Sequence, residues 1–259
     1  MPQIDVNDTR LHFIDEGPRD APALLLSHSL FLDSTMFDGL SERLAGELRV
    51  VRYDHRGQGA SRRAPAGELG MDTLTEDAAA LVEELELPSC HVAGNSMGGF
   101  VALRLAARRP DLILSCAILG SSGEPERRGA GLEPLVAHLR EHGTDAVVDS
   151  VMQMMFGDTF LADAARAGER EHWRGRILAL DHPAIGDAAH HVVARKGVLG
   201  ELGSTDVPIL AVAGEEDHVS AAELSANVAE ATPNGRFEVV ARAGHSLALE
   251  EPEAVAALL

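Results

Sequence analysis

Lysine is almost absent from this chain, and positive charge is scarce. Lys196 is the single lysine among 259 residues, and arginine supplies the other cationic side chains. Acidic residues outnumber basic ones by 41 to 22, which gives a formal charge of −19 at pH 7. Phosphate backbones and anionic bilayers bind basic surfaces, so this balance argues against nucleic acid and against a membrane as partners.

Cysteines are few, and long apolar runs are missing. Cys90 and Cys116 each lie in an apolar, strand-like run, which predicts buried free thiols, with a disulfide between them as the less favoured alternative. No apolar run approaches membrane-spanning length, and the polar start MPQIDVNDTR lacks the apolar stretch of a signal peptide. We therefore expect a cytoplasmic protein, whose 45% hydrophobic content is enough for one large core.

Short apolar segments alternate with segments of helical spacing along the first half of the chain. A hairpin is expected first, with its turn at Asn7-Asp8, because this residue pair tolerates left-handed backbone. Strands without polar alternation, interleaved with helices, indicate a parallel sheet that helices cover on both faces. The predicted strands after the hairpin are 23–27, 50–53, 89–93 and 112–119, and the predicted helices are 35–48, 73–87 and 97–109.

The alternation stops between residues 121 and 203, where helical patterns follow one another without a convincing strand. A long insertion in such a series rarely lies idle, so we expect 121–203 to form a helical cap over a core built from 1–120 and 204–259. The core is then predicted to resume with a strand at 207–213, a helix begun by a Ser220–Glu223 capping box, a strand at 236–240 and a final helix from about residue 250.

A G-x-S-x-G motif, Gly94-Asn95-Ser96-Met97-Gly98, stands between a predicted strand and a predicted helix. A strand-to-helix elbow exposes the serine hydroxyl, and the two glycines remove side chains that would collide there. We therefore predict that Ser96 is a nucleophile. The following helix points its N-terminus at the serine, so the N–H of Met97 is a candidate donor to an oxyanion.

A serine nucleophile needs an imidazole to accept its proton, and the imidazole needs a carboxylate to orient it. His245, just past the last strand and after a flexible Ala-Gly, is the predicted base. Three carboxylates follow the strand at 207–213. Asp217 is favoured over Glu215 and Glu216 because it lies farthest along the turn that leads back toward the sheet. The chain order serine, acid, histidine is the one expected for this type of elbow.

A second strand-to-loop stretch, LLLSHSL at 24–30, is predicted to face the elbow. The N–H of Leu30 is the predicted second oxyanion donor, and His28 is expected to brace the loop rather than to react. The histidines of the insertion, among them His172, are interpreted as surface or cap packing. Their spacing suggests no metal site, and no cofactor is expected.

Together these segments resemble the α/β-hydrolase fold superfamily over nearly the whole chain. The resemblance rests on YDHRGQGAS at 53–61, GNSMGG at 94–99, GEEDHVS at 214–220 and AGHSLALEEPE at 243–253. It implies an eight-stranded, mostly parallel sheet flanked by helices, with a helical cap inserted after the sixth strand. It also implies a triad of Ser96, Asp217 and His245 at the carboxyl edge of the sheet.

Within the superfamily, the stretches at 24–38 and 50–67 look most like 3-oxoadipate enol-lactone hydrolases, whose loop carries Ser-Leu where many relatives have His-Gly. The resemblance implies a serine hydrolase that opens a small enol-lactone through an acyl-enzyme. Candidate substrate contacts are Ser29, Trp173 and Arg174. Arg195 with Lys196 is the alternative source of a cation for a substrate carboxylate.

Other activities stay open at this point. A carboxylesterase or a carbon–carbon bond hydrolase would use the same triad with a different cap pocket. A ligand-binding receptor on the same scaffold would turn over slowly or not at all. Dehalogenase and epoxide hydrolase chemistry is disfavoured, because both need a carboxylate where this chain has Ser96. The expected partner is a small ester or lactone, and the expected assembly is a monomer or a homodimer.

Overall fold

Eight strands form one sheet in the computed structural model, which describes residues 2–127 and 129–259. The strand order is β1-β2-β4-β3-β5-β6-β7-β8; β2 runs antiparallel to both of its neighbours, and all other neighbouring strands are parallel. The predicted eight-stranded, mostly parallel sheet is therefore confirmed. The strands are β1 (Gln3–Val6), β2 (Thr9–Glu16), β3 (Ala23–Ser27), β4 (Arg49–Tyr53), β5 (Cys90–Asn95), β6 (Ile113–Leu119), β7 (Ile209–Gly214) and β8 (Gly235–Val240).

The predicted hairpin joins β1 to β2 at its expected turn. Asn7 and Asp8 have φ angles of 42° and 61°, so both residues lie in the left-handed region that a tight hairpin turn requires. Asparagine and aspartate occupy this region more readily than other non-glycine residues. The turn chemistry at this position is therefore local, which explains why the pattern of residues was enough to predict it.

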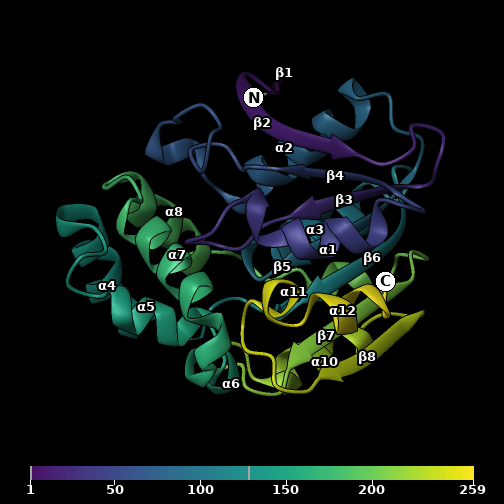
Figure 1. Cartoon of the computed structure of the whole chain (residues 1–259). Helices are drawn as coiled ribbons and strands as arrows, with labels where there is room; N and C mark the ends of the chain where they lie inside the picture. The colour runs from purple at the N-terminus through teal and green to yellow at the C-terminus, as the bar shows by residue number, and fades with distance from the viewer. Residues whose placement is uncertain (1, 128) are drawn as a thin grey trace.

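Helices flank the sheet and occupy most of the chain between the strands (Figure 1). Helix α1 packs against α11 and α12, whereas α2 packs against α3, which lies on β5 and β6. The flanking helices are η1 (Ser34–Phe37), α1 (Asp38–Leu44), η2 (Ala66–Glu68), α2 (Met71–Glu84), α3 (Met97–Arg108), α10 (Ala222–Glu230), α11 (Leu247–Glu250) and α12 (Pro252–Ala256). The predicted helix at 35–48 is thus a 3₁₀ turn followed by a shorter α-helix.

The predicted capping box at the start of α10 is wrong. The helix begins at Ala222 with Ala221 as its N-cap, and no side chain caps it. Ser220 instead donates its backbone N–H to Oδ1 of Asp217, at 2.9 Å. Ser220 therefore belongs to the turn around Asp217. Its backbone is held by that hydrogen bond and it is not the N-cap that the local pattern predicts.

The chain between β6 and β7 is helical, as its sequence predicts. Its helices gather beside one edge of the sheet, on the left of Figure 1. They are α4 (Gly129–His142), α5 (Val148–Met155), α6 (Asp158–Ala162), η3 (Ala164–Arg166), α7 (Ala167–Leu178), α8 (Ala184–Val193) and α9 (Leu199–Leu202). We refer to residues 121–203 as the cap; its treatment as a separate domain stays a prediction.

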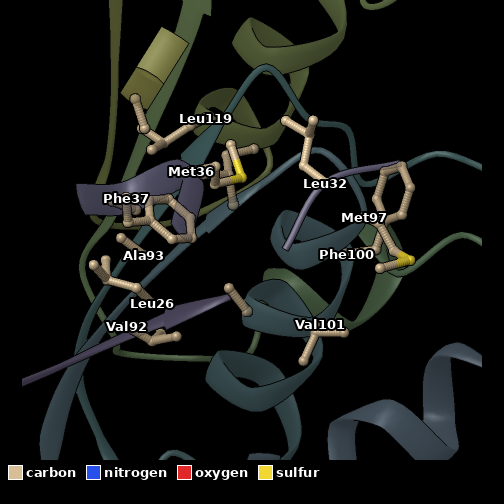
Figure 2. Close-up of a cluster of buried hydrophobic side chains, with 14 of the residues drawn as sticks. Leu26, Leu32, Met36, Phe37, Val92, Ala93, Met97, Phe100, Val101 and Leu119 are labelled. Atoms are coloured by element: carbon tan, nitrogen blue, oxygen red, sulfur yellow. The ribbon is translucent and has the colours of Figure 1, made fainter. Parts of the chain in front are cut away.

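The hydrophobic core lies between the sheet and its helices. Figure 2 shows part of it, where Met36 and Phe37 of η1 lie beside strand residues such as Leu26 and Val92, all of them buried. Such packing holds the loops that follow β3 and β5 in fixed positions. No helix among the described residues has the length and apolar character needed to cross a bilayer.

The two cysteines lie in this core as free thiols. Cys90 and Cys116 are both buried on the neighbouring strands β5 and β6, and they are not joined by a disulfide. Burial raises the pKa of each thiol to about 12. Both groups therefore stay protonated at neutral pH, where the thiol rather than the reactive thiolate is present.

Candidate active site

Ser96 stands at a strained corner between β5 and α3. Its φ of 51° and ψ of −111° place a residue that is not glycine in a sparsely populated region of backbone space. The chain turns sharply there because two glycines let backbone segments touch. A Cβ on Gly94 would lie 2.1 Å from the carbonyl oxygen of Gly98, and a Cβ on Gly98 would lie 1.9 Å from that of Ser27.

The structure brings Ser96, His245 and Asp217 together. The Ser96 Oγ lies 2.7 Å from Nε2 of His245, and Nδ1 of the same ring lies 2.9 Å from Oδ2 of Asp217. The side chains of His245 and Asp217 are only 4% and 1% exposed. These contacts join residues 149 and 28 positions apart in the chain, so the tertiary fold alone assembles them.

The hydrogen bonds around Asp217 determine which ring nitrogen of His245 carries the proton. Oδ1 of Asp217 accepts the N–H groups of Val219 and Ser220, at 2.8 and 2.9 Å. A carboxylate only accepts hydrogen bonds, so Nδ1 of His245 must donate to Oδ2. The neutral ring then leaves Nε2 unprotonated, and this nitrogen accepts from the Ser96 hydroxyl. The arrangement is chemically poised to remove the serine proton.

The two competing carboxylates lie elsewhere. Glu215 accepts the backbone N–H of Arg242 at 3.1 Å. Glu216 accepts both the N–H and the hydroxyl of Thr159 in the cap, at 2.7 and 2.6 Å. Of the three acids that follow β7, Asp217 is the one that contacts His245.

The peptide that carries the Leu30 N–H is held in place by His28. Nε2 of His28 accepts the backbone N–H of His55 at 3.0 Å, so the ring proton resides on Nδ1, which donates to the Ser29 carbonyl at 2.8 Å. Burial lowers the pKa of His55 well below its usual value, with a smaller contribution from His28. Because the peptide bond is planar and trans, tying the Ser29 carbonyl directs the Leu30 N–H to the opposite side.

The peptide that carries the Met97 N–H is tied in the same way. The carbonyl oxygen of Ser96 accepts the hydroxyl of Ser121 at 2.8 Å and the N–H groups of Gly99 and Phe100 in the first turn of α3. The N–H of Met97 therefore points away from these partners, at the N-terminus of a 12-residue helix. Both predicted oxyanion donors thus belong to peptides whose orientation is fixed.

A cavity of about 310 Å³ opens beside Ser96 and His245. Phe100 and Arg195 form part of its wall, and the guanidinium carbon of Arg195 lies 4.0 Å from the centre of the Phe100 ring. Arg195 also lies 3.4 Å from a carboxylate oxygen of Glu126. Burying a cation against an aromatic face and a carboxylate stabilises its charge. Among residues 2–127 and 129–259, the wall also contains the charged residues Glu124 and Arg127, which form an ion pair with each other.

The structure does not bring Ser29, Trp173 or Arg174 to this cavity. Ser29 is fully buried in the loop after β3. Trp173 lines a different cavity on α7, next to Arg176, and Arg174 pairs with Asp149 at 3.3 Å. Trp173 and Arg174 are consecutive residues of a helix, so their side chains point in different directions. The sequence spacing alone could therefore have indicated that they would not face the same cavity.

Sequence reasoning missed the acidic part of the cavity wall. Glu124 and Glu126 follow β6 directly, in the segment SSGEPERR. Their position was the available signal, because the carboxyl ends of parallel strands meet at one edge of the sheet, where ligands bind in open α/β folds. Arg195, from the alternative pair of cations, does line the cavity, whereas Lys196 does not.

Across residues 2–127 and 129–259, no group of three or more histidine, cysteine or carboxylate side chains is arranged to hold a metal ion.

Known proteins with similar sequences are hydrolases or related enzymes. A protein named as a carbamate hydrolase, RutD, from Agrobacterium fabrum is 27% identical over 253 residues, which cover 94% of each chain. The 3-oxoadipate enol-lactonase 2 of Acinetobacter baylyi is 25% identical, over 97% of this chain and 92% of its own. The crystal structure of the enol-lactonase from Burkholderia xenovorans LB400 superposes with a TM-score of 0.92 at 27% identity, covering 99% of this chain and 97% of that one.

Residues 22–252 match the family described as the alpha/beta hydrolase fold. The matched range contains the elbow at Ser96, the turn at Asp217 and the loop at His245, as well as the whole sheet from β3 onward. The strand order of the sheet, the strained turn at Ser96 and this family match all indicate the same fold. This chain belongs to the alpha/beta hydrolase fold family and is an enzyme that acts on ester- or lactone-like bonds.

Proposed function

We propose that this enzyme opens a small enol-lactone, similar to 3-oxoadipate enol-lactone, through an acyl-enzyme on Ser96. The observation that carries the proposal is the contact chain from the Ser96 hydroxyl through His245 to Asp217, at 2.7 and 2.9 Å. Hydroxyl, imidazole and carboxylate in this order supply a nucleophile, its base and the group that orients the base.

The reaction begins when Nε2 of His245 takes the Ser96 proton and Oγ attacks the lactone carbonyl. The N–H groups of Leu30 and Met97 receive the oxyanion, and Asp217 stabilises the charged imidazolium. His245 then protonates the leaving enol oxygen, which opens the ring and leaves the acyl group on Ser96. Water, deprotonated by His245, attacks the acyl carbonyl and releases the acid.

Cavity size and relatives support a lactone substrate. About 310 Å³ is at the small end of ligand pockets, which suits a compact ring rather than a long acyl chain. Enol-lactonases occur both among the related sequences and among the similar structures. The buried guanidinium of Arg195 offers a cation for a substrate carboxylate in a chain of net charge −19.

An uncharged carboxylic ester is the second candidate, and the charge of the cavity wall favours it. Arg195 lies beside Glu126, and Arg127 pairs with Glu124, so these four wall residues sum to zero charge. A cation already beside a carboxylate attracts a second carboxylate less strongly.

A substrate panel separates these candidates. We expect kcat/KM to be highest for a carboxylate-bearing enol-lactone, lower for short aryl esters, and lowest for vinylogous diketones, the substrates of carbon–carbon bond hydrolases. Replacing Arg195 by Gln should reduce kcat/KM for the charged lactone by about 10- to 100-fold, because a charge-assisted hydrogen bond contributes about 1.5–3 kcal/mol. The same variant should leave neutral esters nearly unaffected.

Lys196→Gln is the matched control for Arg195→Gln, because Lys196 is the next residue but does not line the cavity. Equal losses on charged and neutral substrates in Arg195→Gln would contradict carboxylate binding and favour the ester candidate. A burst of product followed by stalled turnover on every substrate would favour a ligand-binding receptor.

His28 should affect the oxyanion step through the Leu30 peptide. Replacing His28 by Ala removes the shorter of two hydrogen bonds to the Ser29 carbonyl and leaves only the longer one, from the Leu32 N–H at 3.3 Å, to hold that peptide. We expect kcat to fall by about 10²- to 10³-fold, the effect of losing one oxyanion donor, with little change in KM. Steady-state kinetics of folded protein, checked by circular dichroism, measure this.

Asparagine is the informative second substitution at this position. Its side-chain N–H₂ lies close to where Nδ1 of His28 lies, so His28→Asn should recover part of the lost kcat. If His28→Ala folds and keeps its kcat, then the Leu30 peptide does not need this hydrogen bond.

A further inference from the structure

Glu250 is a buried carboxylate that the reaction described above does not use. It ends α11, five residues after His245, and is 3% exposed. Among the described residues it forms no ion pair through its side chain. The Arg166 guanidinium donates to the backbone carbonyl of Glu250, at 2.7 Å, and not to its side chain.

Three backbone N–H groups point at this carboxylate. Oε2 of Glu250 accepts from Gly244 at 3.0 Å, and Oε1 accepts from Ser246 at 3.0 Å. These two donors flank His245 on either side. The third donor is the N–H of Gly157 in the cap, 2.8 Å from Oε2. One side chain therefore holds the Ala243–Gly244 and His245–Ser246 peptides of the loop and one peptide of the cap.

The cap and the His245 loop touch directly at this point. A Cβ on Gly244 would lie 2.1 Å from the backbone nitrogen of Gly157, so no side chain fits between the two segments. The N–H of Ser246 also reaches the carbonyl of Met155, at the end of α5, at 3.0 Å. The carboxylate of Glu250 thus lies where two backbones meet. Its loss would leave the buried N–H groups of Gly157 and Gly244 without this acceptor, whereas the Ser246 N–H would keep the Met155 carbonyl.

The other side of the loop is held by the elbow. The side-chain N–H₂ of Asn95, next to Ser96, donates to the carbonyl oxygen of His245 at 2.8 Å. Side chains therefore hold the His245–Ser246 peptide at both its carbonyl and its N–H, and the Ala243–Gly244 peptide at its N–H. Asn95 sets the loop relative to the nucleophile, and Glu250 sets it relative to the cap.

We propose that Glu250 is a positioning residue: its carboxylate holds the His245 loop against Gly157 of the cap, so that the imidazole stays in line between Ser96 and Asp217. The proposal rests on the proposed function, because it assumes that His245 is the base. The new element is that the position of His245 depends on the cap. The same oxygen of Glu250 accepts the N–H of Gly244, next to His245, and the N–H of Gly157 in the cap.

The ionisation of Glu250 argues against a role in stability alone. Burial raises the pKa of this carboxyl to about 7, although the three N–H groups act in the opposite direction. A raised pKa means that ionisation costs folding free energy, and this cost grows as the pH rises from the ordinary value of 4.5 to about 7 and is constant above it. A group kept for stability alone would not carry that cost.

The test compares Glu250→Gln and Glu250→Asp with Glu251→Gln, all in the full chain and with an aryl ester as substrate. Glutamine replaces one carboxylate oxygen by an amide N–H₂, which cannot accept a hydrogen bond from a backbone N–H, and aspartate is too short to reach all three donors. Displacement of a catalytic group by about 1 Å costs about 100-fold in rate, so we expect kcat of Glu250→Gln to fall by about that factor, with KM changed less than about threefold. Glu250→Asp should show an intermediate loss.

Glu251→Gln is the matched control, because Glu251 is the next residue and only meets Arg242 at the surface, at 3.5 Å. It should keep the kcat of the parent. The second readout is the low-field proton NMR signal of the His245 Nδ1–H, which should shift or broaden in Glu250→Gln and stay in place in the control. A loss of stability without displacement of the imidazole would leave that signal unchanged.

Wild-type kcat in folded Glu250→Gln or Glu250→Asp would overturn the proposal, as would a lost kcat with an unmoved Nδ1–H signal. If Glu250→Gln does not fold, Glu250→Asp decides alone by the same two readouts. Failure here is distinguishable from failure of the proposed function. Ser96→Ala tests the latter, and an inactive Ser96→Ala beside a fully active Glu250→Asp would reject only the role of Glu250.

Discussion

Replacing Ser96 by alanine should reduce kcat by roughly 10⁴- to 10⁶-fold, the range found when a serine hydrolase loses its nucleophile. In the proposed mechanism the Ser96 hydroxyl forms the covalent acyl intermediate, and no other group of the mechanism takes this role. Steady-state hydrolysis of an activated aryl ester measures the loss. Mass spectrometry after a rapid quench should show the acyl adduct in the parent and not in the variant.

Loss of activity in Ser96→Ala must not come from unfolding. Alanine is more strained than glycine at a φ of 51°, but no more so than serine, so the melting temperature should change little. Ser122→Ala is a suitable comparison, because Ser122 lines the same cavity without contacting His245. Turnover retained by Ser96→Ala would refute the acyl-enzyme mechanism outright.

Replacing Asp217 by asparagine should lower kcat by about 10⁴-fold while leaving the site nearly superposable. The amide oxygen would keep the N–H groups of Val219 and Ser220, which turns the amide N–H₂ toward His245. Nδ1 would then have to accept, and the ring proton would move to Nε2. With its proton facing the Ser96 hydroxyl, His245 no longer acts as a base.

Glu215→Gln makes the same chemical change two residues away and is the control for Asp217→Asn. Glu215 accepts a hydrogen bond from Arg242 at an exposed position, so its replacement should leave kcat within about twofold. Equal losses in the two variants would mean that general charge, rather than the tautomer of His245, supports catalysis. Recovery of Asp217→Asn activity at high pH, without recovery in Ser96→Ala, would agree with the proposed role.

Local patterns in the sequence were enough for the fold. The apolar strands, the helices between them and the Asn7-Asp8 turn depend on residues that are near neighbours in the chain, so their pattern predicted the sheet that the structure confirms. The elbow could be recognised from its local motif, although only the Gly94–Gly98 contact is local, because Gly98 also makes room for the Ser27 carbonyl of β3. The acid and the base could be selected because their positions after the last two strands place them at the same edge of the sheet.

Only the tertiary structure decided what surrounds these residues. The sequence pattern predicted Ser220 as part of a helix capping box, but in the structure its backbone N–H donates to the Asp217 carboxylate. The predicted substrate contact Trp173 lines a cavity between α7 and the core, and Arg174 pairs with Asp149 of α5, because helix orientation is set by packing between elements and not by residue type. In the sequence Glu250 looks like an ordinary surface acid. The structure shows that its carboxylate accepts the backbone N–H of Gly157, 93 positions earlier in the chain. Periodicity and turn chemistry act within a few residues, whereas a cavity wall and the support behind a catalytic loop come from segments that only the folded chain brings together.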